Sequence, residues 1–517
     1  MAIARRLPDW GWLLLIGLLA QFFWFWRLPE PTHMDAYYYL TNGIRLAEGH
    51  GFTEEVIWQF LDEPAGLPTP SHSYWMPLPS MLAALGWLIS PTYRAAQLPF
   101  YLLTATLPLL SFAIANWLWR DRQLAWLAGL LTAAGGFYAS VWNQPETFAP
   151  FAWAGGLALW YLALARTGDQ RRHWFGAGLL AALAHLSRAD GLLFLGIGGL
   201  LLWPRRWDRQ TLLAQVQSGL FLLVGYLLLM GPWLLRNWRA LGRPLTTAGS
   251  QTLFLTNYDD LFAYGRQFSL AEYLAWGGGN ILSSKLAGLS TALQTFIAIC
   301  GLVFLTPLII VAWRQLWRNA ETRVRILPLT LYTVLLFVAM SLFFTFPGMR
   351  GGLFHSTTAI WPWLMALAPA GLRQSIQWIA ARRPSWQPAT AWRVFAPALV
   401  VLALALTVAA GGLRGQQDEV VSDIYPQLVE WLPAGATVLV RDPPGFYYHT
   451  GHPAISVPNE PLAVTLAAAR QYGATYLILD ENHPEPLTEL YQAPDSTAAV
   501  THIADLATVK VFLIGAE

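Results

Sequence analysis

Cysteine is nearly absent from this chain of 517 residues, which contains one. That residue, Cys300, lies within an apolar run. A lone thiol cannot form a disulfide within the chain, and it excludes the paired-cysteine motifs that bind zinc or carry out redox chemistry. The sequence therefore contains neither a disulfide framework nor a cysteine-based metal or redox site.

Charged residues are also scarce. They make up 12% of the chain, against about 25% in an ordinary soluble domain, whereas hydrophobic residues make up 55%. One soluble core cannot bury so much apolar chain, so the excess must face lipid or other helices within a membrane. The net charge of +2 is too small to indicate a nucleic-acid partner. The composition predicts an all-α polytopic membrane protein.

Apolar runs of membrane-spanning length recur along the sequence. A helix crosses a bilayer with about 20 residues, at about 1.5 Å per residue. The runs of this kind are 11–27, 96–119, 123–142, 147–165, 211–235, 290–313, 326–346, 356–372 and 394–413. No internal repeat or low-complexity tract accompanies them.

Two further stretches are ambiguous by length. The stretch 174–203 is too long for one upright helix, and the polar sequence SRADG at 187–191 interrupts it, which predicts two short helices meeting at a turn. The stretch 75–95 contains three prolines, so it is either a short span or a helix lying at the membrane surface.

The distribution of arginine decides between the topologies, because cytoplasmic loops are enriched in cations. If 174–203 is a helix pair and 75–95 does not span, every dense arginine cluster falls on one side. These clusters are Arg5 and Arg6; Arg120 and Arg122; Arg166, Arg171 and Arg172; Arg205, Arg206 and Arg209; Arg314, Arg318, Arg323 and Arg325; and Arg373, Arg382, Arg383 and Arg393. We therefore expect about eleven spans in the plasma membrane, with a cytoplasmic N-terminus on a retained first anchor.

This topology places the long loops 28–95 and 236–289 on the outer face. Hydropathy falls from Gly415 onward, where 437–440, 476–479 and 509–514 are typical of buried strands and 461–472 of a helix. The sequence predicts a transmembrane domain over residues 1–413 and a small extracytoplasmic α/β domain over 414–517.

The first outer loop contains the most distinctive polar segment, HMDAYYYLTNGIRLAEGHGF at 33–52. Asp35 has two interpretations: a carboxylate at a helix start, or a general base in a partly dry site, where burial makes a carboxylate a stronger proton acceptor. The tyrosines, Tyr38 among them, either form an interfacial aromatic belt or contact a substrate.

This segment resembles the first outer loop of the GT-C glycosyltransferases, and it is most similar to the branch of the protein O-mannosyltransferases and lipid A aminoarabinose transferases. Segments similar to later family motifs follow in the same order over roughly residues 8–372. They are NQPETFAPF at 143–151, HLSRADG at 185–191, GPWLLRNWRALGRPL at 231–245 and RGGLFHS at 350–356.

The resemblance implies an enzyme that transfers a hexosyl or pentosyl group, with inversion, from a polyprenyl-phosphate donor to a hydroxyl of a protein, lipid or glycan acceptor. It implies that Asp35 is the catalytic base and that Glu146 orients the acceptor or Asp35. His72 lies near the position where the aminoarabinose branch has a lysine facing the phosphate. The chain departs from the family near His72, because it has no lysine there. It departs again at Ala36, because mannosyltransferases have an Asp-Glu doublet where this chain has Asp35 followed by Ala36.

Several cations lie on the predicted outer face, which the positive-inside rule should deplete. They are Arg188, Arg236, Arg239, Arg243, Arg266, Arg350 and His355. A departing lipid phosphate needs cations at this interface. The alternative is that each arginine snorkels to lipid phosphates or stabilises a helix C-terminus. We expect Arg188, Arg236, Arg350 and His355, together with His72 and Tyr38, to bind substrate.

Metal sites are weakly indicated. The pair Asp259 and Asp260 could hold a divalent cation, but neighbouring carboxylates on a loop more often face water. His449 and His452 are better explained by a turn between strands. We therefore predict no essential metal and no other cofactor.

Two other function classes remain open. A transporter or lipid-linked sugar flippase should carry charges near the bilayer midplane, often in two related halves, whereas here the acids gather in outer loops. A non-enzymatic membrane scaffold would explain the helices but not the outer-face set of Asp35, Glu146, Arg188, Arg350 and His355.

Overall fold

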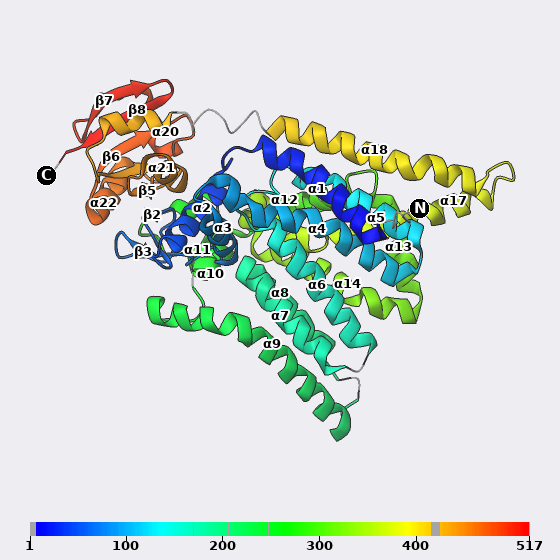
Figure 1. Cartoon of the computed structure of the whole chain (residues 1–517). Coiled ribbons are helices and arrows are strands. Elements are labelled where there is room, and N and C mark those ends of the chain that lie inside the picture. The colour runs from blue at the N-terminus through cyan, green and yellow to red at the C-terminus, as the bar shows by residue number, and fades with distance from the viewer. Residues whose placement is uncertain (1–6, 169, 205, 247, 415–423, 516–517) are drawn as a thin grey trace.

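The computed structural model describes residues 7–168, 170–204, 206–246, 248–414 and 424–515. Arg5, Arg6 and Arg205, which the sequence assigns to inner loops, lie outside these residues. Figure 1 shows a body of packed helices with the sheet of the C-terminal part at one end.

Within the described residues, six helices are long and apolar enough to cross a membrane. They are α1 (Asp9–Arg27), α4 (Tyr93–Trp119), α6 (Phe148–Thr167), α9 (Arg209–Leu241), α14 (Ala320–Val338, continued by η6 at Ala339–Phe343) and α18 (Pro388–Arg414). Along α9, Leu213, Val216, Leu220, Val224 and Leu228 are each more than half exposed. Exposing such an apolar surface to water would be strongly unfavourable, whereas lipid chains solvate it. The protein is a multi-pass membrane protein.

Further helices complete the bundle. They are α5 (Arg122–Ala134), η1 (Gly136–Tyr138), α7 (Arg171–Ser187), η2 (Ala189–Gly191), α8 (Leu192–Leu201), α12 (Gly278–Gln294), η5 (Thr295–Cys300), α13 (Thr306–Arg318), α15 (Thr345–Pro347), η7 (Gly348–Gly352), α16 (Leu353–Ser356), η8 (Thr357–Ala359) and α17 (Trp361–Ala380). The predicted helix pair within 174–203 is confirmed, because α7 and α8 flank a turn at 188–191.

The prediction of one continuous span over 290–313 is wrong. Helix α12 begins earlier, at Gly278, and leads into the π-helical segment η5, and α13 starts only at Thr306. Between them Leu302 and Val303 have positive φ angles of 46° and 59°. The Thr306 hydroxyl donates to the Ile297 carbonyl across this break, at 3.0 Å. An apolar run predicts burial or lipid contact, but it does not reveal a break stabilised by one hydroxyl.

The first outer loop is folded. It contains α2 (Met34–Ala47), the short strands β1 (Thr53–Glu54), β2 (Val56–Ile57) and β3 (Thr69–Pro70), and α3 (Leu78–Ile89). At 12 residues, α3 is about 18 Å long, too short to cross a bilayer unaided. It packs closely against α2 at Gly43, where a Cβ atom would lie 2.8 Å from the Ser80 carbonyl oxygen. The second loop contains α10 (Ala248–Gln251), η3 (Thr252–Phe254), η4 (Tyr258–Phe262) and α11 (Leu270–Ala275).

The C-terminal part contains the predicted strands and helix. Its elements are α20 (Tyr425–Leu428), η9 (Val429–Trp431), β4 (Thr437–Val440), α21 (Pro443–Thr450), β5 (Ala454–Ser456), α22 (Leu462–Tyr472), β6 (Ala474–Leu479), η10 (Glu485–Leu487), α23 (Thr488–Gln492), β7 (Val500–Leu506) and β8 (Val509–Ile514). His449 lies in the last turn of helix α21, so the predicted turn between strands at His449 and His452 is wrong in its first half.

The sheet also takes in a strand from the first outer loop. In the described chain its order is β2-β5-β4-β6-β8-β7, with β2, β5, β4 and β6 parallel. Val56 and Ile57 of β2 pair with Ala454 and Ile455 of β5. Arg45 Nη1 also donates to the Tyr447 hydroxyl, at 3.2 Å. The C-terminal part is thereby attached directly to the loop that carries Asp35.

Candidate functional site

A cavity of about 700 Å³ opens where the start of α2, the α7–α8 turn, the second outer loop and the segment around 347–355 meet. Four of the residues predicted to act on substrate line it: Asp35, Arg188, Arg350 and His355. They come from four separate elements, α2, the α7–η2 turn, η7 and α16. The fold thus brings together side chains more than 300 residues apart in the sequence.

Asp35 lies in the first turn of α2, where the helix dipole favours a carboxylate. The residue that caps this helix is His33, so Asp35 is not the N-cap. The Asp35 side chain is half-buried and lines the cavity. Burial, and next the negative charge of Glu146, raise the pKa of Asp35, against the opposing charges of His355, His33 and Arg188. Asp35 is therefore a stronger proton acceptor than an aspartate in water.

Glu146 is fully buried and lies between two histidines. Its Oε1 is 3.5 Å from His33 Nε2, and its Oε2 is 3.4 Å from His355 Nδ1. Burial alone would raise the pKa of Glu146, but the two histidines outweigh it and lower that pKa. Thr147 adds a hydroxyl that donates to Glu146 Oε2 at 3.1 Å and contacts His355 Nδ1 at 3.0 Å. Glu146 is thus held as an anion close to Asp35.

The segment of Glu146 is tied to the first outer loop by further contacts. Gln144 Oε1 accepts from the Thr32 backbone N–H at 3.0 Å, and Gln144 Nε2 donates to the Thr32 hydroxyl at 2.9 Å. Thr32, directly before the motif HMDAYYY, and Gln144, in the motif NQPETFAPF, are therefore in direct contact, although 112 residues separate them.

Arg188 joins three walls of the cavity. Its Nε donates to Asp190 Oδ1 at 3.0 Å, its Nη1 to the Thr147 hydroxyl at 3.5 Å and its Nη2 to the Gly352 carbonyl at 3.3 Å. The turn that holds it is tight, because a Cβ atom at Gly191 would lie 2.3 Å from the Ala184 carbonyl carbon. This explains the sequence SRADG, where a charged pair is followed by a glycine.

Arg350 and His355 also line the cavity. The exposed Arg350 guanidinium lies 4.9 Å from the centre of the Tyr258 ring, a cation–π contact with the second outer loop. Gly351, at φ 140°, allows the chain to turn directly after it. His355 stacks on Phe148 with ring centres 4.1 Å apart. Arg350 is therefore available at the cavity surface, while His355 is fixed beside Glu146.

Apolar and aromatic side chains also line the cavity. Trp58 and Trp75 stack in parallel at 3.9 Å, and Leu192, Met340 and Phe344 belong to the same lining. A lining that combines charged and apolar side chains suits an amphipathic ligand.

Three predicted substrate-binding residues, Tyr38, His72 and Arg236, do not line this cavity. The Tyr38 hydroxyl accepts from the His72 backbone N–H at 2.8 Å, and the His72 ring contacts the hydroxyls of Ser71 and Ser80 at 2.8 and 2.9 Å. Arg236 Nη2 donates to the Phe52 carbonyl at 2.7 Å. Burial lowers the pKa of His72 to about 3, so this ring is neutral and cannot replace the lysine of the aminoarabinose branch.

Four further residues of the site were not predicted from the sequence: His33, Thr147, Asp190 and Tyr258. The first three lie within motifs quoted above, and their polar side chains beside the predicted site residues are the signal that identifies them. Tyr258 lies in the second outer loop, and no local pattern places it over Arg350.

Asp35, Glu146 and His355 also offer three ligand atoms within 4.8 Å of one another. Two carboxylates and an imidazole suit zinc or manganese. The donor types and their closeness fit a divalent cation.

Known structures share this fold. No protein-family model and no curated protein matches the sequence. The chain is similar to ArnT from Cupriavidus metallidurans bound to undecaprenyl phosphate, at 15% identity and a TM-score of 0.56, over 98% of each chain. It is also similar to the archaeal oligosaccharyltransferase AglB from Archaeoglobus fulgidus in complex with an inhibitory peptide and a dolichol-phosphate, at 11% identity and a TM-score of 0.53, over 91% of this chain and 69% of that one. Both are GT-C glycosyltransferases, so the predicted GT-C fold is confirmed.

Proposed function

We propose that this protein is an inverting glycosyltransferase that moves a sugar from a polyprenyl phosphate to an acceptor hydroxyl outside the cytoplasm, with Asp35 as general base. The observation that carries the proposal is the cavity whose lining combines Asp35, the guanidinium groups of Arg188 and Arg350, and apolar and aromatic side chains. The bound lipid phosphates of the two structural neighbours support the class of donor.

The proposed reaction is a single displacement. The acceptor hydroxyl gives its proton to the Asp35 carboxylate as its oxygen bonds to the anomeric carbon. The bond from that carbon to the phosphate oxygen breaks, and the lipid phosphate leaves with the electron pair. Attack from the face opposite the leaving group inverts the anomeric configuration. General base catalysis of this kind contributes about 10²- to 10⁴-fold.

The leaving phosphate needs positive charge, which Arg188 and Arg350 supply. Three of the five N–H groups of Arg188 are bonded to Asp190, Thr147 and Gly352, which leaves two for phosphate oxygens. These bonds fix the guanidinium before substrate arrives, so little reorganisation is needed as charge develops. The exposed Arg350 adds a second cation at the mouth.

Three residues outside the cavity lining are proposed as supports. Tyr38, His72 and Arg236 hold the first outer loop through mutual and backbone hydrogen bonds. We propose that residues 414–517 form an extracytoplasmic domain that keeps this loop in place through β2 and assists acceptor binding. The proposed topology has eleven spans and a cytoplasmic N-terminus, in the plasma membrane. The sugar is a hexose or a pentose, and the acceptor a protein, lipid or glycan.

The pH dependence of transfer tests the role of Asp35. Only the deprotonated carboxylate accepts a proton, so kcat/KM is expected to rise with pH through the Asp35 pKa. Because burial and Glu146 raise that pKa, the acid limb should lie above the ordinary aspartate range of about 3.9. Glu146→Gln removes a neighbouring negative charge and should move the limb to lower pH. A limb that stays in place or moves to higher pH would contradict the assignment.

Metal removal distinguishes the proposed base from a metal ligand. An ion held by Asp35, Glu146 and His355 would supply a Lewis acid, and Asp35 would then no longer be available as a base. We propose that no metal is required. Dialysis against EDTA is therefore expected to leave the rate of transfer unchanged. A loss of activity that added Mn²⁺ or Zn²⁺ restores would assign these side chains to an ion instead.

A further inference from the structure

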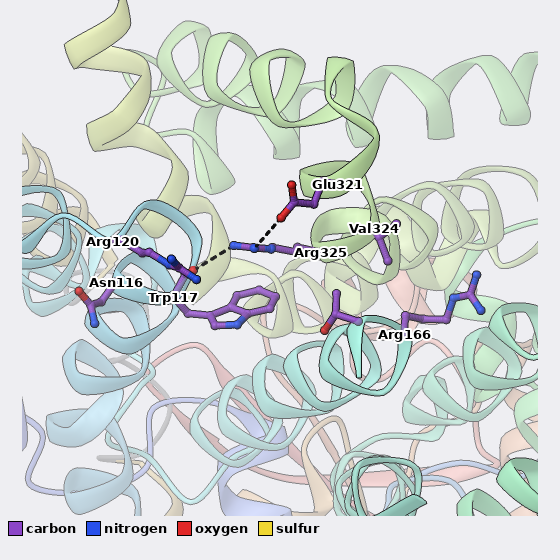
Figure 2. Close-up of a pocket in the computed structure, with 8 residues that line it drawn as sticks. Asn116, Trp117, Arg120, Arg166, Glu321, Val324 and Arg325 are labelled. Carbon is purple, nitrogen blue, oxygen red and sulfur yellow. Dashed lines mark hydrogen bonds and ion pairs between the residues drawn. The ribbon is translucent and has the colours of Figure 1, made fainter. Parts of the chain in front are cut away.

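A second cavity, of about 570 Å³, lies among the end of α4, the end of α6 and the beginning of α14. Its lining includes Trp117, Arg120, Arg166, Glu321 and Arg325. Figure 2 shows the Arg325 side chain between Glu321 and Trp117, with Arg120 beyond Trp117. The proposed transfer reaction does not use this cavity.

Helix α6 fixes how far this cavity is from the first one. Glu146 lies just before its start, and Arg166 lies in its last turn. The 20 residues of α6 extend about 30 Å, which is the thickness of the hydrocarbon core of a bilayer. The second cavity therefore lies at the opposite membrane surface from the proposed transfer site. In the proposed topology that surface is cytoplasmic.

The cavity has a positive lining. Three arginines and one carboxylate line the cavity. The carboxylate is that of Glu321, whose side chain is 82% exposed. Water and salt screen an exposed charge strongly. Arg325 is only 19% exposed and contacts Glu321 and the Trp117 carbonyl at 3.6 and 3.5 Å, near the limit for such contacts. Its guanidinium also lies 5.6 Å from the centre of the Trp117 ring, so its partners are one cation–π contact and two long polar contacts, and it lines the cavity.

Helix ends explain part of this charge but not Arg325. Arg120 and Arg166 lie at the C-termini of α4 and α6, where a cation is favoured by the helix dipole. Arg325 lies in the second turn of α14, away from any helix C-terminus, so the helix dipole does not account for it. Figure 2 shows the Arg325 side chain extending toward Arg120, while the Arg166 side chain points the other way. Two guanidinium groups that approach each other in this cavity indicate a site for a negatively charged group.

We infer that this cavity binds the phosphate group of an anionic glycerophospholipid from the cytoplasmic leaflet. Arginine guanidinium groups pair with phosphate oxygens through two parallel hydrogen bonds. The centre of the Trp117 ring lies 6.1 Å from that of Trp160 and 6.2 Å from that of Trp363. Trp117 supplies an aromatic wall at the level where lipid headgroups meet acyl chains. Basic pockets between spanning helices on this side of a membrane bind anionic headgroups. The lipid would occupy the space that the long Arg325–Glu321 contact now crosses.

Lipid titration of the purified full-length protein in mild detergent tests this inference. Bound lipid is counted by native mass spectrometry against phosphatidylglycerol, phosphatidylcholine and inorganic phosphate. Wild type should bind one phosphatidylglycerol much more tightly than phosphatidylcholine. The variant Arg120→Gln/Arg325→Gln should bind it about 25-fold more weakly, at roughly fivefold for each arginine.

Two further variants make the result specific. Arg314→Gln/Arg318→Gln removes two exposed arginines from the same predicted side but outside the cavity lining, and it should bind as wild type does. Glu321→Gln removes the competing carboxylate and should tighten binding, a gain that misfolding cannot produce. Equal binding of the two lipids, unchanged affinity in Arg120→Gln/Arg325→Gln, or full competition by inorganic phosphate would each overturn the inference. Because this assay measures no sugar transfer, its outcome is independent of the proposed reaction.

Discussion

Asp35→Asn is expected to lower kcat/KM for sugar transfer by about 10³-fold, within the range that general base catalysis contributes. Asparagine has nearly the same shape as aspartate but cannot accept the acceptor proton at neutral pH. The α2 helix should persist, because Asp35 is not its cap. KM for the lipid donor should change little, since Arg188, Arg350 and the aromatic wall stay in place.

A carboxylate at the other end of the same helix provides the control for this variant. Glu48 follows the last residue of α2 and is exposed, so Glu48→Gln should transfer sugar at the wild-type rate. Asp35→Glu keeps a carboxylate but displaces it by one methylene, and an intermediate rate is expected. Equal rates for wild type and Asp35→Asn would remove Asp35 from the mechanism.

Arg188→Lys is expected to lower kcat by about 10²- to 10³-fold. Removing one fixed hydrogen-bond donor from the place where negative charge develops in a transition state has an effect of this size. Lysine retains the positive charge, so the largely buried Asp190 keeps a partner. The ammonium group cannot reproduce the fork that contacts Asp190, Thr147 and Gly352 together. Single-turnover rates with a radiolabelled polyprenyl-phosphate sugar would measure the loss.

Two other arginines separate a catalytic effect from a structural one. Arg350 is exposed and stacks on Tyr258, so Arg350→Gln should fold normally and still lower the rate, by a smaller factor than Arg188→Lys. Arg239 is exposed on the same predicted face but does not line the cavity, so Arg239→Gln should be silent. Equal losses in Arg239→Gln and Arg350→Gln would mean that general surface charge, and not the cavity, governs the rate.

Much of the fold followed from local patterns. The length of each apolar run indicated most of the helices, and the interruption SRADG indicated the turn that now holds Arg188. The period of the apolar residues and the content of β-branched residues predicted β4, β6 and β8. The period of the apolar residues also predicted helix α22. These features depend on short stretches of chain, which is why a sequence pattern contains them.

Features that depend on contacts between distant segments could not be predicted. Strand β2 has two residues, and only its pairing with β5 defines it as part of the sheet. The break between α12 and α13 depends on a hydrogen bond from Thr306. His72 and Arg236 have side chains of the kinds that a phosphate site needs, yet they do not line the cavity. Residue type selects candidates for a site, and packing decides which of them face a ligand.

The central claim is most directly tested by following the fate of a labelled donor. The full-length wild-type protein, reconstituted in liposomes, is incubated with polyprenyl phosphates carrying radiolabelled hexoses or pentoses and with cell-envelope acceptors. With one of these donors, label should pass to an acceptor hydroxyl with inverted anomeric configuration, and one polyprenyl phosphate should be released for each sugar transferred. Movement of intact donor or solute across the bilayer, with no glycosidic bond formed for any donor, would contradict the account and favour a transporter or flippase.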